Sequence, residues 1–137
     1  ELLASSGARY DPRVSSRIQR GQAISAADYI DVLNARTAWI AEVQAQVADH
    51  DALVMPTVPV IAPKLAETAA SDEVYTQTNL LILRNPTLIN FLDGCAISLP
   101  CHRPGEAPVG LMLAAPRLHD QRLLSISLAV EAALQGA

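Results

Sequence analysis

The residue pair whose chemistry stands out in this sequence is Cys101-His102, a thiol beside an imidazole. A base close to a cysteine can activate the thiolate as a nucleophile. However, the pair falls in a segment of turn composition, where neighbouring side chains seldom point at each other, and a catalytic pair is normally assembled by the fold. We therefore interpret Cys101 and His102 as turn residues.

The histidines and cysteines do not have the spacing of a metal site. His50, His102 and His119 are far apart, so none forms the i, i+4 pair that two ligands on one helix face would need. Cys95 and Cys101 have no second pair beside them, which gives neither a disulfide framework nor a zinc pattern. We expect surface histidines and reduced thiols. The acidic residues beside the histidines, Asp49, Asp51 and Asp120, fit strand starts and helix caps better than acid–base catalysis.

The stretch DALVMPTVPVIAP, residues 51–63, begins as an apolar strand and then carries Pro56, Pro59 and Pro63. Proline fixes φ and cannot continue a central sheet, so the strand is predicted to end in a stiff, extended loop. Such a loop is either a linker or a rigid support for ligand contacts. Thr57 is the best candidate contact, because the prolines around it leave its backbone little entropy to lose. The alternative is that Thr57 only bonds nearby backbone.

Helices are predicted on both sides of this stretch. The first covers Tyr10 to Gly21, and the second begins at a capping box made by Ser25 and Asp28 and ends near Asp49, with one apolar face buried over about six turns. A third begins at Ser71 or Asp72, is interrupted by Pro86 and ends near Asp93. The last begins at an Asp120 cap.

Short apolar runs at residues 52–55, 95–99 and 108–114 predict three strands, the last two paired as a hairpin. Their apolar faces need helices on both sides, so we predict an α/β fold with a mixed β-sheet of about three strands. None of these strands carries the charged residues that discourage an edge strand from pairing, which indicates that the three strands are a portion of a larger sheet. Three polar residues lie near the helix that Pro86 interrupts: Asn85, Asn90 and Asp93. Their side chains could contact the same ligand as Thr57, although turn and cap roles suit them as well.

Composition excludes several classes of protein. The 137 residues are 50% hydrophobic and 18% charged, which predicts one globular domain over residues 1–137. The net charge is −4, basic residues are scattered and aromatic residues make up 4%, so nucleic acid is not an expected partner. No apolar run reaches the roughly 20 residues that span a bilayer, and no secretory signal opens the chain, so we expect no membrane association and a cytoplasmic location.

Four motifs in series resemble the C-terminal part of the amidase signature hydrolases. They are the stretch from Asp51 to Pro63, the stretch NFLDGCAISLP at residues 90–100, the run Pro108-Val109-Gly110-Leu111, and the helix from Asp120 through Leu124 to Glu131. The opening YDPRVSSRIQRGQAISAADY is similar to the helical approach to that region. The pair Cys95-Ala96 departs from the family, which usually has proline before the small residue.

The resemblance implies hydrolysis of a carbon–nitrogen amide bond in a small molecule by a serine, a second serine in a cis peptide and a lysine base, without metal or organic cofactor. This chain does not match that machinery. Lys64 is its only lysine and lies in the proline loop, and Ser5-Ser6-Gly7 lacks the preceding glycines. We therefore expect no catalytic residue here, and an inactive portion of an amidase that forms one wall of the substrate pocket through Thr57, Asn85, Asn90 and Asp93. The alternative is a non-catalytic interaction module that associates through open sheet edges, and either form could be a homo-oligomer.

Overall fold

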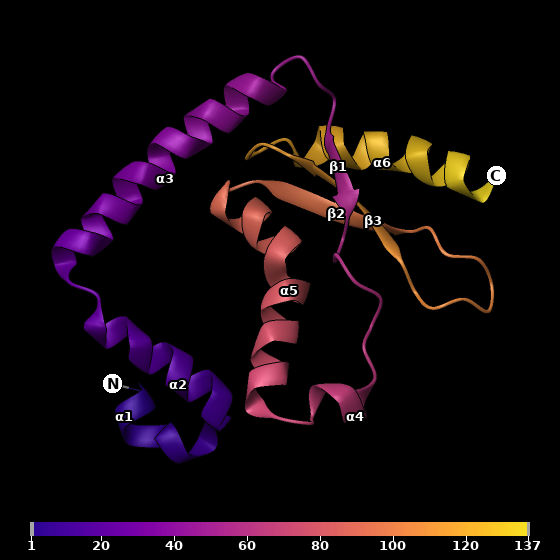
Figure 1. The fold of residues 1–137 in the computed structure, drawn as a ribbon. Coiled ribbons are helices and arrows are strands. Elements are labelled where there is room, and N and C mark those ends of the chain that lie inside the picture. The colour runs from indigo at the N-terminus through magenta and orange to yellow at the C-terminus, as the bar shows by residue number, and fades with distance from the viewer. Residues whose placement is uncertain (1, 137) are drawn as a thin grey trace. The chain divides into compact units, whose positions relative to one another are not determined.

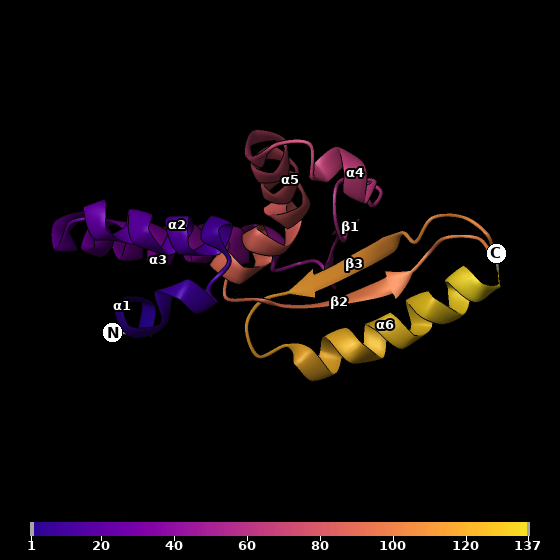
Figure 2. The same cartoon turned by 90° about the horizontal axis from the view of Figure 1, so that it is seen from below.

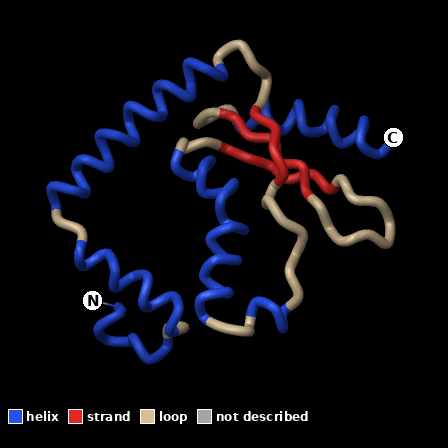
Figure 3. Tube along the Cα trace, in the orientation of Figure 1, coloured by secondary structure: helices blue, strands red, loops and turns tan. Residues whose placement is uncertain are grey.

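The computed structural model of the protein describes residues 2–136. Contacts divide the chain into one unit up to Thr37 and a second from Ala38 onward. Figures 1 and 3 show the order of the elements along the chain, with helices in both units and all the described strands in the second. The candidate site lies entirely in the second unit.

The first unit is helical. It contains α1 (Leu2–Ser6), a 3₁₀ turn (Gly7–Arg9), α2 (Pro12–Arg20) and a second 3₁₀ turn (Gly21–Ala23). The predicted start of α2 is confirmed, because the Asp11 side chain accepts a hydrogen bond of 2.8 Å from the Arg13 amide and Pro12 occupies the first helical position.

Helix α3 (Ala26–Val47) begins at the predicted capping box. The Asp28 amide donates to the Ser25 hydroxyl at 3.1 Å, and the Ser25 amide and hydroxyl donate to the Asp28 carboxylate at 3.2 and 2.7 Å. These hydrogen bonds, the one from the Ser25 hydroxyl first, hold the pKa of Asp28 below its ordinary value.

The predicted burial of one face along α3 is wrong. No residue of α3 is buried, and Tyr29 in its first half is 59% exposed. Trp39, Ile40, Val43 and Val47 in the second half are half-buried, and the Trp39 ring lies 5.4 Å from that of Phe91. The periodic pattern identifies a face that is able to be buried, but burial requires a second element packed against it.

The sheet contains β1 (Leu53–Pro56), β2 (Cys95–Pro100) and β3 (Gly110–Ala115) in the order β1-β3-β2. Both pairings are antiparallel, and β2 and β3 form the predicted hairpin. The α/β class with about three strands is confirmed, although the described residues contain no parallel pair. At one end of the sheet Gly110 pairs with Pro100, and at the other Ala115 pairs with Cys95.

Helices cover opposite faces of the central strand (Figure 2). On one face α6 (Asp120–Gln135) packs Leu123 against Leu99, Leu113 and Ala115. On the other, Ile89 of α5 (Asp72–Phe91) packs against Met112 and Ala114. From Met112 to Ala115, β3 is therefore buried on both sides, which explains its almost uniformly apolar sequence.

Two local predictions need correction. Pro86 does not break α5, which runs on to Phe91. The proline removes one amide donor, but Asn85 and Ile89 beside it are buried, and their packing holds the helix together. Asp120 is the first residue of α6 rather than its cap, since the cap position is His119 and makes no side-chain capping bond. The predicted Ser71 cap of α5 is confirmed, because its side chain accepts from the Val74 amide at 3.2 Å.

The capping box makes the first turn of α3 sensitive to pH. Because the pKa of Asp28 is lowered on folding, its contribution to stability is complete above the pKa of the unfolded chain and is lost as pH falls through the folded value. Replacing Ser25 with alanine should raise the Asp28 pKa toward its ordinary value. A carboxyl-detected NMR titration of both proteins measures this, and an unchanged Asp28 pKa in Ser25→Ala would contradict the assigned cause.

Candidate functional site

Thr57 follows directly after β1 and is held by two hydrogen bonds. Its amide donates to the Gly110 carbonyl at 2.8 Å, so the pairing with β3 continues one residue beyond the strand. Its hydroxyl oxygen Oγ1 lies 2.5 Å from Oγ of Ser98 in β2, and either atom can be the donor. The alternation of side chains along β1 places Thr57 on the same face of the sheet as Met55 and Met112, the face that α5 packs against.

Gly110 lies between the two hydroxyl groups. A Cβ atom added to Gly110 would lie 2.6 Å from Thr57 Oγ1 and closer still to Ser98 Oγ. The hydroxyl pair therefore occupies the space that a side chain at position 110 would need. We call Thr57, Ser98 and Gly110 the hydroxyl cluster. Three different strand segments contribute to it.

Ser98 is a site residue that the sequence reasoning missed. Two signals could have identified it: a serine inside the apolar run Cys95–Pro100, and a glycine at the start of the facing strand, which often marks the close approach of another group. What could not be predicted is the order β1-β3-β2, which brings Thr57 and Ser98 to either side of Gly110.

Asn85 supports the end of β1 from inside α5. Its side chain is only 6% exposed, and its Nδ2 donates to the Pro56 carbonyl at 2.7 Å. Its Oδ1 accepts from Arg84 Nε at 3.3 Å, so both ends of the amide have partners. The structure thus brings the predicted residues Thr57 and Asn85 to one peptide group, since Asn85 donates to the carbonyl of the Pro56–Thr57 peptide and Thr57 supplies its N–H.

Asn90 and Asp93 lie toward the other end of the sheet. Asn90 is in the last turn of α5, and its carbonyl accepts from the Asp93 amide at 3.2 Å. Asp93 has a left-handed φ of 59°, and its carboxylate lies 3.5 Å from the Arg117 guanidinium, which follows β3. These contacts are those of a helix end and a turn. The role of all four residues in a substrate pocket stays a prediction.

An apolar cavity of about 170 Å³ lies beside the proline loop. It is lined by residues of the loop and of the approach to β3: Pro56, Val58, Pro59, Val60, Ile61, Pro108, Val109 and Gly110. None of these side chains carries a charge. The loop itself runs from the end of β1 to the short helix α4 (Leu65–Thr68), with Lys64 as the residue before that helix (Figure 3).

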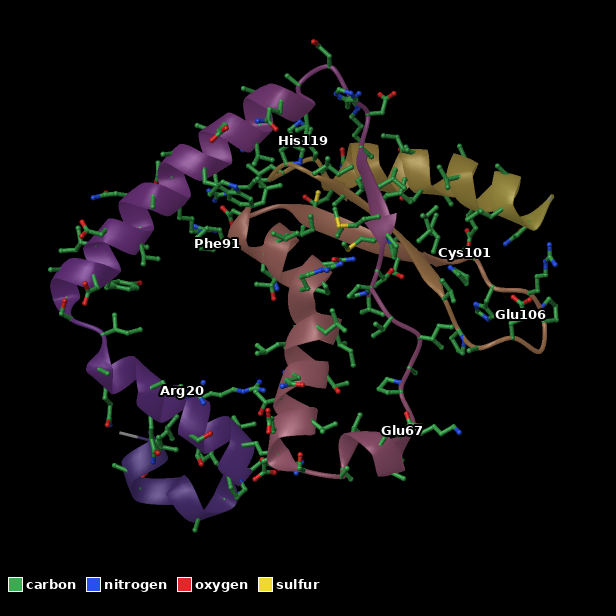
Figure 4. The ribbon with its side chains drawn as sticks, viewed as in Figure 1. Arg20, Glu67, Phe91, Cys101, Glu106 and His119 are labelled. Atoms are coloured by element: carbon green, nitrogen blue, oxygen red, sulfur yellow. The ribbon has the colours of Figure 1, made fainter. Side chains whose placement is uncertain are left out.

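The side chains of Cys101 and His102 both contact Val109 across the hairpin. The Cys101 thiol donates to the Val109 carbonyl at 3.6 Å, and the Val109 amide donates to His102 Nδ1 at 3.4 Å. This arrangement agrees with the interpretation of the pair as turn residues. His119 lies at the opposite end of the sheet from Cys101 (Figure 4), where its Nδ1 donates to the Arg117 carbonyl at 3.0 Å.

Other charged groups make ordinary surface contacts. Asp51 and Arg122 form an ion pair of 2.5 Å in which both side chains are more than half exposed, and such pairs contribute little to stability. Within residues 2–136 no three His, Cys, Asp or Glu side chains are grouped so that they could hold a metal ion. Among these residues, no helix is both long and apolar enough to cross a membrane.

Taken together, these features define an α/β protein whose polar groups gather where an edge strand enters a stiff loop. The chain belongs to the amidase family: the family model described as Amidase matches residues 2–124. The family predicted from the sequence motifs is therefore confirmed.

Several curated proteins are similar to the chain. It is 33% identical over 129 residues to 2-amino-5-chloromuconic acid deaminase of Comamonas testosteroni, a match covering 90% of this chain and 27% of that protein. It is 32% identical to a glutamyl-tRNA(Gln) amidotransferase subunit of Streptomyces coelicolor, covering 92% and 26%. A solved structure described as an amidase superposes on 95% of this chain and 30% of its own, with a TM-score of 0.74 and 24% identity. The chain spans about 27% of the length of the deaminase.

The Asn85 amide should be important for stability. Replacing Asn85 with alanine removes the donor to the Pro56 carbonyl and leaves a buried cavity, which should lower the free energy of unfolding by about 2 kcal/mol. Replacing Asn34, an exposed asparagine of α3, with alanine should change it by no more than about 0.5 kcal/mol. Urea unfolding followed by circular dichroism measures both, and equal losses would show that the bond to Pro56 contributes nothing specific.

The hydroxyl cluster should not tolerate a side chain at position 110. Gly110→Ala should separate the Thr57 and Ser98 hydroxyls and lower the free energy of unfolding by about 1–3 kcal/mol. Adding Ser98→Ala to that variant removes the nearer oxygen, so the double variant should recover part of the loss. A double-mutant cycle measured by urea unfolding checks this coupling, and strictly additive effects would contradict it.

Proposed function

We propose that this chain is part of an amidase that hydrolyses a carbon–nitrogen amide bond, and that the end of β1 forms one wall of the substrate pocket. The observation that carries the proposal is the support of Thr57. The peptide group that links Pro56 to Thr57 donates its N–H to the Gly110 carbonyl and accepts at its own carbonyl from Asn85, and the Thr57 hydroxyl is hydrogen-bonded to Ser98. A side chain held in this way loses little entropy when it contacts a ligand.

The hydroxyl pair can orient an amide. When one hydroxyl donates to the other, the acceptor still has its own proton to donate outward, and both oxygens keep lone pairs. Such a pair can therefore donate to a substrate carbonyl or accept from a substrate N–H. Membership of the amidase family supports a substrate with these two groups.

We further propose that the chain has no activity alone. An attacking hydroxyl needs a base within hydrogen-bond reach, and the partner of Thr57 Oγ1 is another hydroxyl, which is not a base near neutral pH. The one lysine, Lys64, lies at the start of α4, where its carbonyl accepts from the Glu67 and Thr68 amides. The nucleophile and its base would then belong to the rest of an amidase.

A second candidate is a non-catalytic interaction module. The observation that favours it is the position of β1 and β2 as the outer strands of the described sheet. Outer strands offer unpaired backbone groups to another chain.

Ammonia release distinguishes these functions. The purified chain, with folding checked by circular dichroism, should release no ammonia above a buffer control from a panel of aliphatic and aromatic amides. A chimera in which the chain replaces the matching segment of the C. testosteroni deaminase should release ammonia from at least one amide of that panel, and release from 2-amino-5-chloromuconic acid shows separately that the chimera is assembled. Turnover by the chain alone would overturn the inactive-portion proposal, and a folded but inactive chimera would favour the interaction module.

The same chimera tests Thr57. Thr57→Val keeps the shape of the side chain but removes the hydroxyl, and it should lower kcat/KM by about tenfold, the cost of one hydrogen bond to the substrate. Thr37→Val, the same substitution at an exposed position of α3 outside the candidate site, should stay within about twofold of the parent. Equal values of kcat/KM for Thr57→Val and the parent chimera would exclude Thr57 from the pocket wall.

A further inference from the structure

Strand β1 is covered on only one of its two faces. Leu53 and Met55 point toward α5 and pack against the cluster around Met112 and Ala114. Val54 pairs with Leu113 and so points to the opposite face, the one that α6 covers over β2 and β3. Although Leu113 is buried beneath α6, Val54 is 59% exposed. The packing of α6 therefore reaches Ala52, just before β1, but leaves Val54 uncovered.

The uncovered surface continues into the proline loop. Pro56 has the same orientation as Val54, and it lines the apolar cavity together with Val58, Ile61 and Val109. Ile61 is 60% exposed, and Val109 is 41% exposed. We call Val54, Pro56, Val58, Ile61 and Val109 the β1 face. It has no ionisable side chain.

The position of the β1 face makes its exposure unusual. β1 is an outer strand of the described sheet, and it carries none of the charged residues that normally prevent an outer strand from pairing. A strand that is apolar on both faces is the pattern of a strand covered on both sides. The residues of β1 thus have the character of an interior strand, and one of its faces has no cover among residues 2–136.

We propose that the β1 face binds the part of an amidase polypeptide that this chain does not span, which packs beside α6. The length of the relatives argues for this occupant, since the chain spans 27% of the deaminase and 30% of the solved amidase chain. The segment that matches this chain is therefore accompanied in both proteins by a much larger part of the same polypeptide. The inference rests on the proposed function only in naming the partner as an amidase.

Co-purification tests the proposal without any assay of hydrolysis. The chain, carrying an affinity tag, is co-expressed with the unmatched part of the C. testosteroni deaminase as a separate polypeptide. Val54→Lys places a charge on the β1 face at a side chain that is already exposed, so the chain itself should still fold. Leu128→Lys on α6, 69% exposed, is the matched control. Val54→Lys should reduce the recovered partner about tenfold or more, and Leu128→Lys less than about twofold.

Hydrogen exchange gives a second measurement that does not depend on a variant. The amides of residues 53–56 should exchange several-fold more slowly with the partner than without it. The proposal is overturned if the wild-type chain recovers no partner, if both variants lose it equally, or if Val54→Lys recovers as much as wild type. It is also overturned if the isolated chain sediments as a dimer that Val54→Lys converts to a monomer, because the occupant would then be a second copy. Association without ammonia release would count against the proposed function and leave this inference standing.

Discussion

The structure of the second unit depends on the burial of β3 on both faces and along both edges. Met112 and Ala114 face α5, Leu113 and Ala115 face α6, and the backbone pairs with β1 on one side and β2 on the other. From Met112 to Ala115 this strand is buried, so it cannot shift its register without moving polar groups or cavities into the core. The positions of Thr57, Asn85 and Ser98 all follow from the register that β3 imposes.

Much of this arrangement could be predicted from the sequence, because the relevant signals are local. The Ser25–Asp28 capping box, Pro12 at the start of a helix and three apolar runs identify elements whose bounds agree closely with the structure. The failures concern non-local effects. Pro86 disrupts an isolated helix, but the burial of Asn85 and Ile89 outweighs its cost, and the first half of α3 has an apolar face without a buried residue.

The candidate site could be predicted only in part for the same reason. Thr57 can be identified from the sequence because the signal, the prolines on either side of it, is local. The sequence indicates Asn85 only as a helix-end residue, yet it acts from within a continuous helix, through a bond to a carbonyl 29 residues earlier in the chain. Ser98 and Gly110 lie next to Thr57 only because of the strand order β1-β3-β2, and apolar patterns do not specify strand order.

The hydroxyl cluster also has a consequence for how related sequences vary. Thr57 and Ser98 are 41 positions apart in the sequence, and Gly110 comes later still. In the structure the two hydroxyl groups fill the space beside the Gly110 backbone. A larger residue at 110 becomes acceptable only when a smaller one stands at 57 or 98. Among natural relatives that keep this strand order, these three positions should therefore covary, and a change at one would be tolerated chiefly in a background where another has already changed.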